Sequence, residues 1–469
     1  MLFQPKREED RDGRFAFSGK VTAVASPCFN KDVIKEFWNN FSFGFSSLEI
    51  SESEELTFRI GGAEPLALDG YAYTINVTPC GICLNAENEK ALLCAFMTLL
   101  DRIYAIDTEN GTAAAVDCAA IWDRACIDNR MVHFCVFPET ELYEIERFVR
   151  FVAALRYTHL IIEFWGMLRF ECLRELSWPF AFDKEDIRPI MQRARDLGLE
   201  IIPMFNHWGH ASAGRVMHGK HVVLDQNISL QSYFSRDGWC WDIRKPKVRE
   251  LLRKIRAELT ELCGEGEYFH IGCDEAYDFD LEKEESQRAI CEFINETASE
   301  LKKSGRRTIV WGDMFLYKHP HYNPLNKYDC NAPTVECEKN MLALLDRDVI
   351  VADWQYNAKK APVETASVFA NAGFDCIMCP WDRGMEQMKA CVSTVKEQKL
   401  FGLMHTTWHT LSSGTPYTAI AALGCFGEIG IKPIPKYKTE TAALLRRVYL
   451  VRGEYARSGW AKKEIGIIT

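Results

Sequence analysis

Two adjacent acids, Asp274 and Glu275, are the residues of this chain whose types and spacing best suit chemistry. They follow a short apolar run, Tyr268 to Ile271, that is typical of a buried strand. Burying a carboxylate is costly and neighbouring carboxylates repel each other, so we expect one pKa of the pair to be raised. A carboxyl group that stays protonated near neutral pH can donate a proton. The simpler alternative is that Asp274 only caps the helix that follows.

The elements that would position these acids are strand-like runs that alternate with amphipathic helices. The expected strands are 124–133, 159–164, 200–205, 268–272, 308–311, 349–354, 375–379 and 400–406. This alternation predicts an α/β protein with a (β/α)8 TIM barrel over residues 119–430. An open doubly wound sheet is disfavoured, because no Gly-x-Gly-x-x-Gly turn follows the first strand.

Two smaller parts flank the expected barrel. Residues 1–118 are predicted to form a small N-terminal α/β domain, with strands at 56–60, 71–77 and 80–84 and a helix at 87–103. Residues 431–469 are predicted to be a C-terminal helical extension, with a helix at 439–452.

Polar and aromatic residues gather where the barrel strands are expected to end, which is where barrel enzymes hold their catalytic residues. A single Trp more often fills a core than binds a ligand, but here Trp follows four successive strands. We therefore expect one pocket with apolar walls around a few acids. Its expected residues, besides the acid pair, are His210, Trp311, Asp313, Trp354, Tyr356, Trp381, Asp382 and Trp408.

Composition limits the classes of partner. The chain has 469 residues, of which 47% are apolar and 26% charged, as in ordinary globular proteins. Its net charge of -10 argues against nucleic acid, and no segment approaches the length of a membrane span. Residues 1–14 are polar and do not resemble a signal peptide, so we expect a cytoplasmic protein whose 18 Cys are reduced.

No metal site and no cofactor are expected. The pairs Cys80/Cys83 and Cys376/Cys379 lie in strand-like runs, where positions three apart face opposite sides. His207 and His210 have no third ligand at a spacing diagnostic of zinc.

The segment His270-Ile-Gly-Cys-Asp-Glu275 resembles the His-x-Gly-x-Asp-Glu signature of the family 20 glycoside hydrolases, the β-N-acetylhexosaminidases. Trp208-Gly209-His210 is similar to the end of that family's strand-three motif, and Arg124 to the sugar-binding Arg that opens its strand one. Trp311, Trp354 and Trp408 fall where the family's acetamido-binding and sugar-stacking tryptophans are expected.

The chain also departs from the family pattern at identifiable positions. Asp128 and Arg130 in strand one are out of register, and Asn206 stands in strand three where acids are usual. Thr410 stands where the family places an acid after the strand-eight Trp, which leaves open how outer sugar hydroxyls are held.

The resemblance implies exo-acting, retaining hydrolysis of a terminal β-linked N-acetylhexosamine, GlcNAc or GalNAc, through an oxazolinium intermediate formed by the substrate's own acetamido group. Glu275 would be the general acid and base, and Asp274 would orient the acetamido N–H. The three tryptophans would enclose the acetamido methyl. Tyr356 would bind the acetamido oxygen, Arg124 the ring hydroxyls, and His210 would tune Glu275.

Two alternatives stay open. One is an ordinary two-carboxylate retaining glycosidase whose nucleophile is Asp313 or Asp353; the other is a non-catalytic sugar-binding relative. In each case the partner is an oligosaccharide or glycoconjugate, with no nucleic acid or membrane. The sequence leaves a homodimer open.

Overall fold

The chain divides into two compact units in a computed structural model. Unit 1 comprises residues 1–124 and the segment from Ile434 onward, and the barrel unit comprises residues 125–433. The structure describes residues 2–164, 166–211, 227–236, 238–318, 328–408, 411–427, 429–430 and 432–449. Contacts thus group the C-terminal helix, predicted as a separate extension, with the N-terminal residues.

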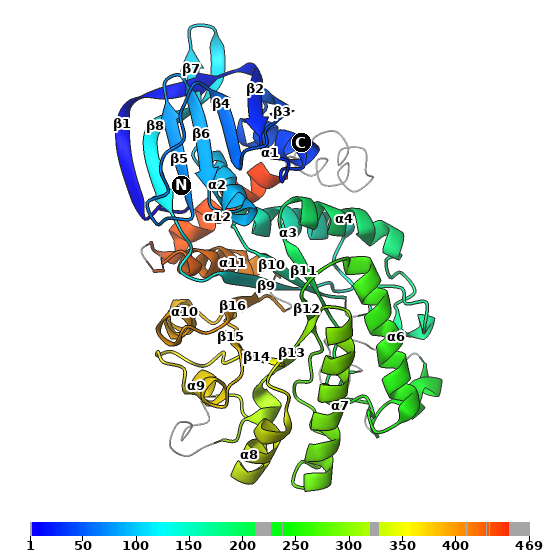
Figure 1. The fold of residues 1–469 in the computed structure, drawn as a ribbon. Coiled ribbons are helices and arrows are strands. Elements are labelled where there is room, and N and C mark those ends of the chain that lie inside the picture. The colour runs from blue at the N-terminus through cyan, green and yellow to red at the C-terminus, as the bar shows by residue number, and fades with distance from the viewer. Residues whose placement is uncertain are drawn as a thin grey trace. The chain divides into compact units, whose positions relative to one another are not determined.

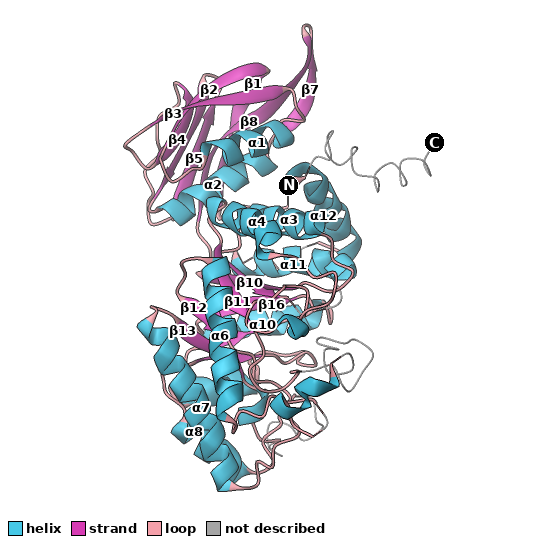
Figure 2. Ribbon diagram, turned by 90° about the vertical axis from the view of Figure 1, so that its right-hand side faces the viewer, coloured by secondary structure: helices cyan, strands magenta, loops and turns pink. Residues whose placement is uncertain are grey.

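Unit 1 is built on one sheet with two helices on one of its faces (Figures 1 and 2). The strand order is β1-β8-β5-β6-β4-β2-β3, and β7 pairs with β8. Phe58 of β4 packs edge-to-face on Phe96 of α2, with ring centroids 5.1 Å apart, so the helix is held by aromatic burial. The elements are β1 (Arg7–Phe17), β2 (Gly19–Ala25), α1 (Lys31–Phe41), β3 (Ser46–Glu52), β4 (Thr57–Gly61), β5 (Tyr73–Thr78), β6 (Gly81–Ala86), α2 (Glu89–Asp101), β7 (Tyr104–Thr108) and β8 (Gly111–Asp123). The three predicted strands and the predicted helix are confirmed as β4, β5, β6 and α2.

The last described helix, α12 (Ile434–Val448), is anchored within unit 1 by Arg447. Its guanidinium donates hydrogen bonds to the carbonyl oxygens of Phe41 (2.8 Å), Leu100 (3.1 Å) and Ile103 (2.9 Å). The same group lies 4.4 Å from the centre of the Phe41 ring. One side chain therefore joins α12 to the ends of α1 and α2.

We predict that Arg447→Met destabilises unit 1 by about 2–4 kcal/mol, because three carbonyl groups lose a charged donor. The matched control is Arg446→Met on the same helix, where the native side chain is exposed. Urea unfolding followed by circular dichroism measures both. Equal stability of the two variants would contradict this role of Arg447.

The barrel unit contains a closed barrel of eight parallel strands (Figure 1). Its strands are β9 (Asn129–Cys135), β10 (His159–Glu163), β11 (Glu200–Met204), β12 (Tyr268–His270), β13 (Arg307–Trp311), β14 (Ile350–Asp353), β15 (Cys376–Met378) and β16 (Gly402–Thr406). Its helices are α3 (Leu142–Ala154), α4 (Lys184–Asp196), α6 (Pro246–Cys263), α7 (Glu284–Lys303), α8 (Val335–Leu344), α9 (Glu364–Asn371), α10 (Met385–Gln398) and α11 (Leu411–Cys425). Short 3₁₀ turns lie at Arg174–Leu176, Ile228–Tyr233 and Asp313–Phe315. The predicted TIM barrel is confirmed.

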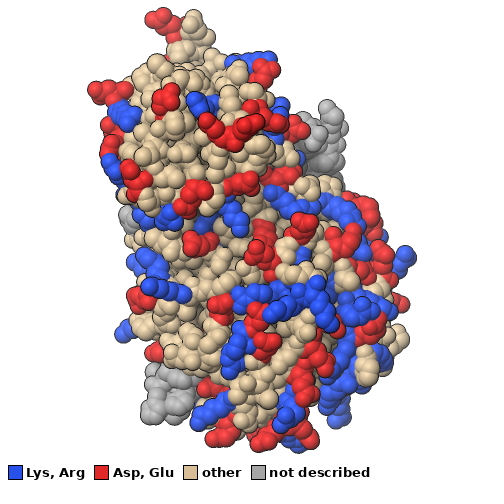
Figure 3. Space-filling model, viewed as in Figure 1, with Lys and Arg blue, Asp and Glu red and all other residues tan. Residues whose placement is uncertain are grey.

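Helix α6 shows how the sequence covers the barrel. Pro246 begins it, where a missing N–H costs nothing, and Val248, Leu252, Ile255 and Leu259 form a buried stripe. Its other residues are mostly charged, and Lys and Arg gather over α6 on the face shown in Figure 3. None of the helices in the described ranges is long and apolar enough to cross a membrane.

The first barrel strand begins at Asn129 and not at residue 124, so this part of the prediction is wrong. Arg124 directly follows β8 in unit 1, where its guanidinium pairs with Glu87 (2.6 Å) and donates to the Gly70 carbonyl (3.2 Å). Strands β8 and β9 lie close together in the sequence, and the predicted run joined the short connection between them to the start of β9. The predicted contact of Arg124 with ring hydroxyls stays a prediction.

Strand alternation decides which polar residues face the inside of the barrel. The inner core contains Met131, Ile161, Met204, Ile309, Ala352, Ile377 and Met404, one for most strands. Asp353 directly follows Ala352 on β14, so its side chain points to the opposite face of the sheet. Its carboxylate accepts hydrogen bonds from Thr365 of α9 (2.6 Å) and Gln355 (2.8 Å), so it faces the helical layer. His405 likewise faces outward, toward Thr418 of α11.

Candidate active site

The backbone after β12 is bent in a way that few residues tolerate. Gly272, Cys273 and Glu275 have φ of 68°, 77° and 47°, in the left-handed region. Non-glycine residues adopt such angles at a cost, and they cluster at functional sites. The next helix, α7, begins only at Glu284 and is preceded by Lys283, so Asp274 is not its cap. The capping alternative is therefore wrong.

Two glycines allow the loops after β11 and β12 to touch. A Cβ on Gly272 would lie 1.9 Å from Asn206 Oδ1, and one on Gly209 would lie 1.9 Å from the Asp274 carbonyl oxygen. Both distances are far inside van der Waals contact. The glycine of the His-x-Gly-x-Asp-Glu segment is thus required by close packing as well as by its positive φ.

His210 is held between the two acids by this close approach. Its Nε2 lies 2.9 Å from Glu275 Oε2 and 3.3 Å from Asp274 Oδ2. Tyr277 donates its hydroxyl to Glu275 Oε1 (2.8 Å), and the Trp239 indole donates to the Glu275 carbonyl (2.6 Å). Asp274 is buried, whereas 30% of the Glu275 side chain is exposed. The acid that would meet a leaving group is therefore the accessible one.

The pKa of Glu275 is shifted in the direction opposite to that expected for a proton donor. Burial acts to raise this pKa, but the hydrogen bond and charge of His210 and the Tyr277 hydroxyl outweigh burial and lower it. In the ligand-free site Glu275 is thus held as a carboxylate, with His210 and Tyr277 as its donors.

Asp313, which contacts the backbone of Glu275, has a raised pKa. Burial and then the charge of Asp274 raise it to about 8. Its Oδ2 accepts the Glu275 backbone N–H (3.0 Å) and the Asn331 side chain (2.7 Å), while Oδ1 accepts the Trp354 indole N–H (3.2 Å). Asp313 thereby fixes the backbone of Glu275 and is 1% exposed, which gives it a positioning role.

The predicted tryptophans do come together. Trp311 and Trp408 have ring centroids 5.7 Å apart, and the Trp408 indole donates to the Tyr356 hydroxyl (2.7 Å). The Tyr356 ring lies 5.2 Å from Trp354 and 5.1 Å from Trp381. These five rings form a continuous aromatic wall, and Trp408 itself has φ of 42°. Such a wall suits the apolar face of a sugar.

The remaining predicted site residues make fewer contacts in the site. Asp382 is half-buried beside Trp381, and in the described part of the chain its side chain makes no hydrogen bond or ion pair. His409 and Thr410 lie outside the described residues. The sequence prediction missed Trp239, Tyr277 and Asn331. Tyr277 had a signal, since it lies two positions after Glu275, but Trp239 and Asn331 come from loops with no pattern of their own.

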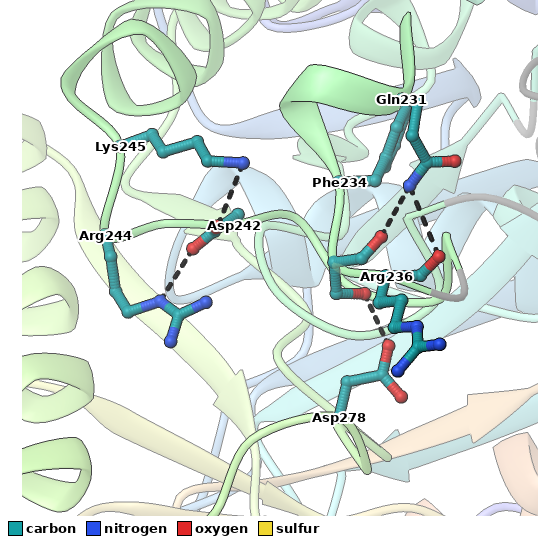
Figure 4. Close-up of a pocket in the computed structure, with 8 residues that line it drawn as sticks. Gln231, Phe234, Arg236, Asp242, Arg244, Lys245 and Asp278 are labelled. Carbon is teal, nitrogen blue, oxygen red and sulfur yellow. Dashed lines mark hydrogen bonds and ion pairs between the residues drawn. The ribbon is translucent and has the colours of Figure 1, made fainter. Parts of the chain in front are cut away.

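A cavity of about 790 Å³ lies along the same two loops (Figure 4). Its wall includes Ser235, whose hydroxyl donates to Asp278, three residues after Glu275. On the other side Arg244 and Lys245 pair with Asp242 at 2.8 and 3.0 Å. The cavity is lined by Gln231, Phe234, Ser235, Arg236, Asp242, Arg244, Lys245 and Asp278, and the acid pair is not among its lining residues.

The parallel barrel with an acid pair and an aromatic wall at its strand ends defines the class of barrel glycoside hydrolases. Residues 171–389 match the family model described as glycosyl hydrolase family 20, catalytic domain. Residues 171–389 therefore resemble a family 20 catalytic domain, and the chain is a glycoside hydrolase. No curated protein sequence matches it.

Solved structures agree on the fold. The exo β-N-acetylglucosaminidase of Vibrio harveyi in complex with N-acetylglucosamine matches with a TM-score of 0.66 at 15% identity, covering 96% of this chain and 76% of that one. The β-N-acetylhexosaminidase of Bacteroides fragilis and that of Streptomyces coelicolor each match with a TM-score of 0.64 at 15% identity, over 95% of both chains. At these identities the likeness shows a shared fold.

We predict that Gly272→Ala is far more destabilising than Gly305→Ala. Both glycines have positive φ, 68° and 77°, but nothing lies within 4 Å of a Cβ at Gly305. Gly305→Ala is the control and should lower the free energy of unfolding by about 1–2 kcal/mol, because only the backbone conformation is penalised. Gly272→Ala should lower it further, because the new Cβ also clashes with Asn206. Denaturant unfolding of the two variants measures the difference. Similar losses would show that the contact with Asn206 relaxes freely.

A second prediction concerns the pH dependence of stability. Because the folded pKa of Asp313 lies near 8, above that of an unfolded Asp, its contribution is fully present below about pH 4 and is lost as pH rises toward 8. Asp313→Asn cannot titrate and removes this decline. Melting temperatures from pH 5 to 9 should fall more steeply for the native protein than for the variant. Parallel curves would contradict the raised pKa.

Proposed function

We propose that the protein is an exo-acting, retaining β-N-acetylhexosaminidase in which the substrate's acetamido group is the nucleophile. The observation that carries the proposal is the pair Asp274–Glu275, on adjacent residues and bridged by His210, beside the aromatic wall. Adjacent side chains at a strand end point in different directions, so the two acids can serve two different atoms of one substrate.

Glu275 acts on the glycosidic oxygen in this proposal. A substrate bound at the carboxyl ends of the barrel strands displaces water from Glu275, and this added burial raises the pKa of Glu275. The glycosidic oxygen of the substrate also takes the place of one of the groups that donate hydrogen bonds to the Glu275 carboxylate. Glu275 can then be protonated when the substrate is bound. It donates this proton to the leaving oxygen and later accepts a proton from the attacking water. His210 and Tyr277 stabilise the carboxylate formed between these two steps.

Asp274 orients and stabilises the acetamido group. Its carboxylate would accept the amide N–H, which makes the amide oxygen a better nucleophile toward C1 and offsets the positive charge of the oxazolinium. Trp311, Trp354 and Trp408 would enclose the methyl and exclude water, and the Tyr356 hydroxyl would meet the amide oxygen. Trp381 extends the wall that contacts the sugar.

The geometry disfavours the two-carboxylate alternative. Asp313 is buried, accepts three hydrogen bonds and has a raised pKa, all of which make it a poor nucleophile. Asp353 faces the helical layer. The Vibrio harveyi relative is an exo β-N-acetylglucosaminidase, which supports GlcNAc as the first sugar to test. GalNAc is the second.

We predict that Glu275→Gln lowers turnover of an aryl N-acetyl-β-glucosaminide by at least about 10²-fold, the usual contribution of a general acid–base. The matched control is Glu282→Gln, an exposed acid on the same loop, which should behave as the native enzyme. Initial rates with the chromogenic substrate measure both. Turnover by Glu275→Gln at the native rate would remove Glu275 from the mechanism.

The role of the acetamido group is tested with substrates whose acetyl hydrogens are replaced stepwise by fluorine. Each fluorine weakens the carbonyl oxygen as a nucleophile, so the rate should fall steadily along the series. A rate independent of fluorination, together with a trapped glycosyl-enzyme, would support a carboxylate nucleophile instead. Binding of N-acetylglucosamine without any cleavage would support the non-catalytic relative.

A further inference from the structure

Three polar side chains meet on the inner surface of the barrel, at the ends of β9 and β10. His133 and Cys135 lie two positions apart on β9 and so share one face, which continues the inner residue Met131. Glu163 ends β10 and pairs in register with Cys135, and it continues the inner residue Ile161. The strand pairing alone therefore brings an imidazole, a thiol and a carboxylate together.

The three ligand atoms form a nearly regular triangle. His133 Nε2 lies 3.4 Å from Glu163 Oε2 and 3.5 Å from Cys135 Sγ, and Cys135 Sγ lies 3.6 Å from Glu163 Oε2. All three residues are at most 2% exposed. Zinc bonds of about 2.0–2.1 Å to N, 2.1 Å to O and 2.3 Å to S at tetrahedral angles require edges of about 3.4 Å for N···O and about 3.6 Å for edges with sulfur. The observed triangle has these edges.

A purely hydrogen-bonded pair accounts for the geometry less well. A charged imidazole–carboxylate hydrogen bond is usually about 2.7–2.9 Å long, and a fully buried ion pair needs good geometry to offset its desolvation. The His133–Glu163 distance of 3.4 Å is longer, and the sulfur is nearly equidistant from both partners. All three atoms instead surround one common point.

We propose that His133 Nε2, Cys135 Sγ and a carboxylate oxygen of Glu163 bind a zinc ion. Nitrogen, sulfur and oxygen ligands together suit zinc, whereas calcium and magnesium prefer oxygen. Among the described residues no fourth His, Cys, Asp or Glu joins the group, so water would be the fourth ligand of a four-coordinate zinc ion. The expectation of no metal came from other residues, the Cys-x-x-Cys pairs, His207 and His210.

The charges of the site balance on binding. The thiol of Cys135 loses its proton to solvent, Glu163 binds as a carboxylate, and His133 binds as a neutral imidazole after releasing any proton it shares with Glu163. Two anionic ligands neutralise Zn²⁺, so the buried cluster carries no net charge. The ring of His133 lies 4.7 Å from Trp408 and 6.1 Å from Trp311, so the ion would lie behind the aromatic wall.

Zinc binding is tested on the full chain, with exposed Cys80 and Cys126 replaced by Ser in every protein to prevent adventitious binding. After chelator treatment, incubation with Zn²⁺ and gel filtration, we expect about one zinc per chain by elemental analysis. Cys135→Ser and His133→Ala should each bind zinc at least about tenfold more weakly. The matched control is Cys379→Ser, another inner-core cysteine with 0% exposure, which should bind as the parent does.

Cobalt provides a readout that reports directly whether a thiolate binds the metal. The Co²⁺-loaded parent and Cys379→Ser should show a thiolate-to-cobalt charge-transfer band in the near ultraviolet, and Cys135→Ser should lack it. Failure to retain zinc, or a band that persists in Cys135→Ser, would overturn the proposal. Neither measurement uses glycosidase activity, so this result and the result for the proposed function are independent.

Discussion

The close approach of the loops after β11 and β12 is the constraint on which the site depends. Gly209 and Gly272 leave no room for a Cβ, and this lets the backbone of one loop lie directly against the other. The contact places His210 within hydrogen-bonding distance of both acids. The left-handed residues of this turn lie after the end of β12, and the barrel strands keep regular parallel pairing.

The acids at the carboxyl ends of the barrel strands differ in pKa, and differences in burial contribute to this. Asp313, which is nearly inaccessible, has a raised pKa and accepts the Glu275 backbone N–H, while His210 and Tyr277 lower the pKa of the more exposed Glu275. The two neighbouring carboxyl groups of the sequence thus belong to a set of three with different environments. The different roles of these three acids follow from the burial of each carboxyl group and from the hydrogen bonds that it accepts.

The sequence predicted the barrel because strand–helix alternation is a repeated local pattern, and all eight predicted strands overlap observed ones. It predicted the acid pair and the aromatic wall because strand ends meet at one mouth. It missed most of the sheet in unit 1, since β1 is a highly charged edge strand and resembles a polar tail. It misplaced Arg124 because β8 and β9 follow each other closely. The group of His133, Cys135 and Glu163 required knowledge of which strands pair in which register.

The connectivity of the chain has a consequence for how the protein forms during synthesis. The barrel unit is inserted within unit 1, whose sheet is synthesised before the barrel and whose helix α12 is synthesised after it. Until Arg447 has been synthesised, the carbonyl groups at the ends of α1 and α2 that it will bind must therefore be hydrogen-bonded to water instead. The barrel can fold before the segment that begins at Ile434 has left the ribosome. Unit 1 therefore begins to form before the barrel unit but gains the contacts of Arg447 only after the barrel has been synthesised.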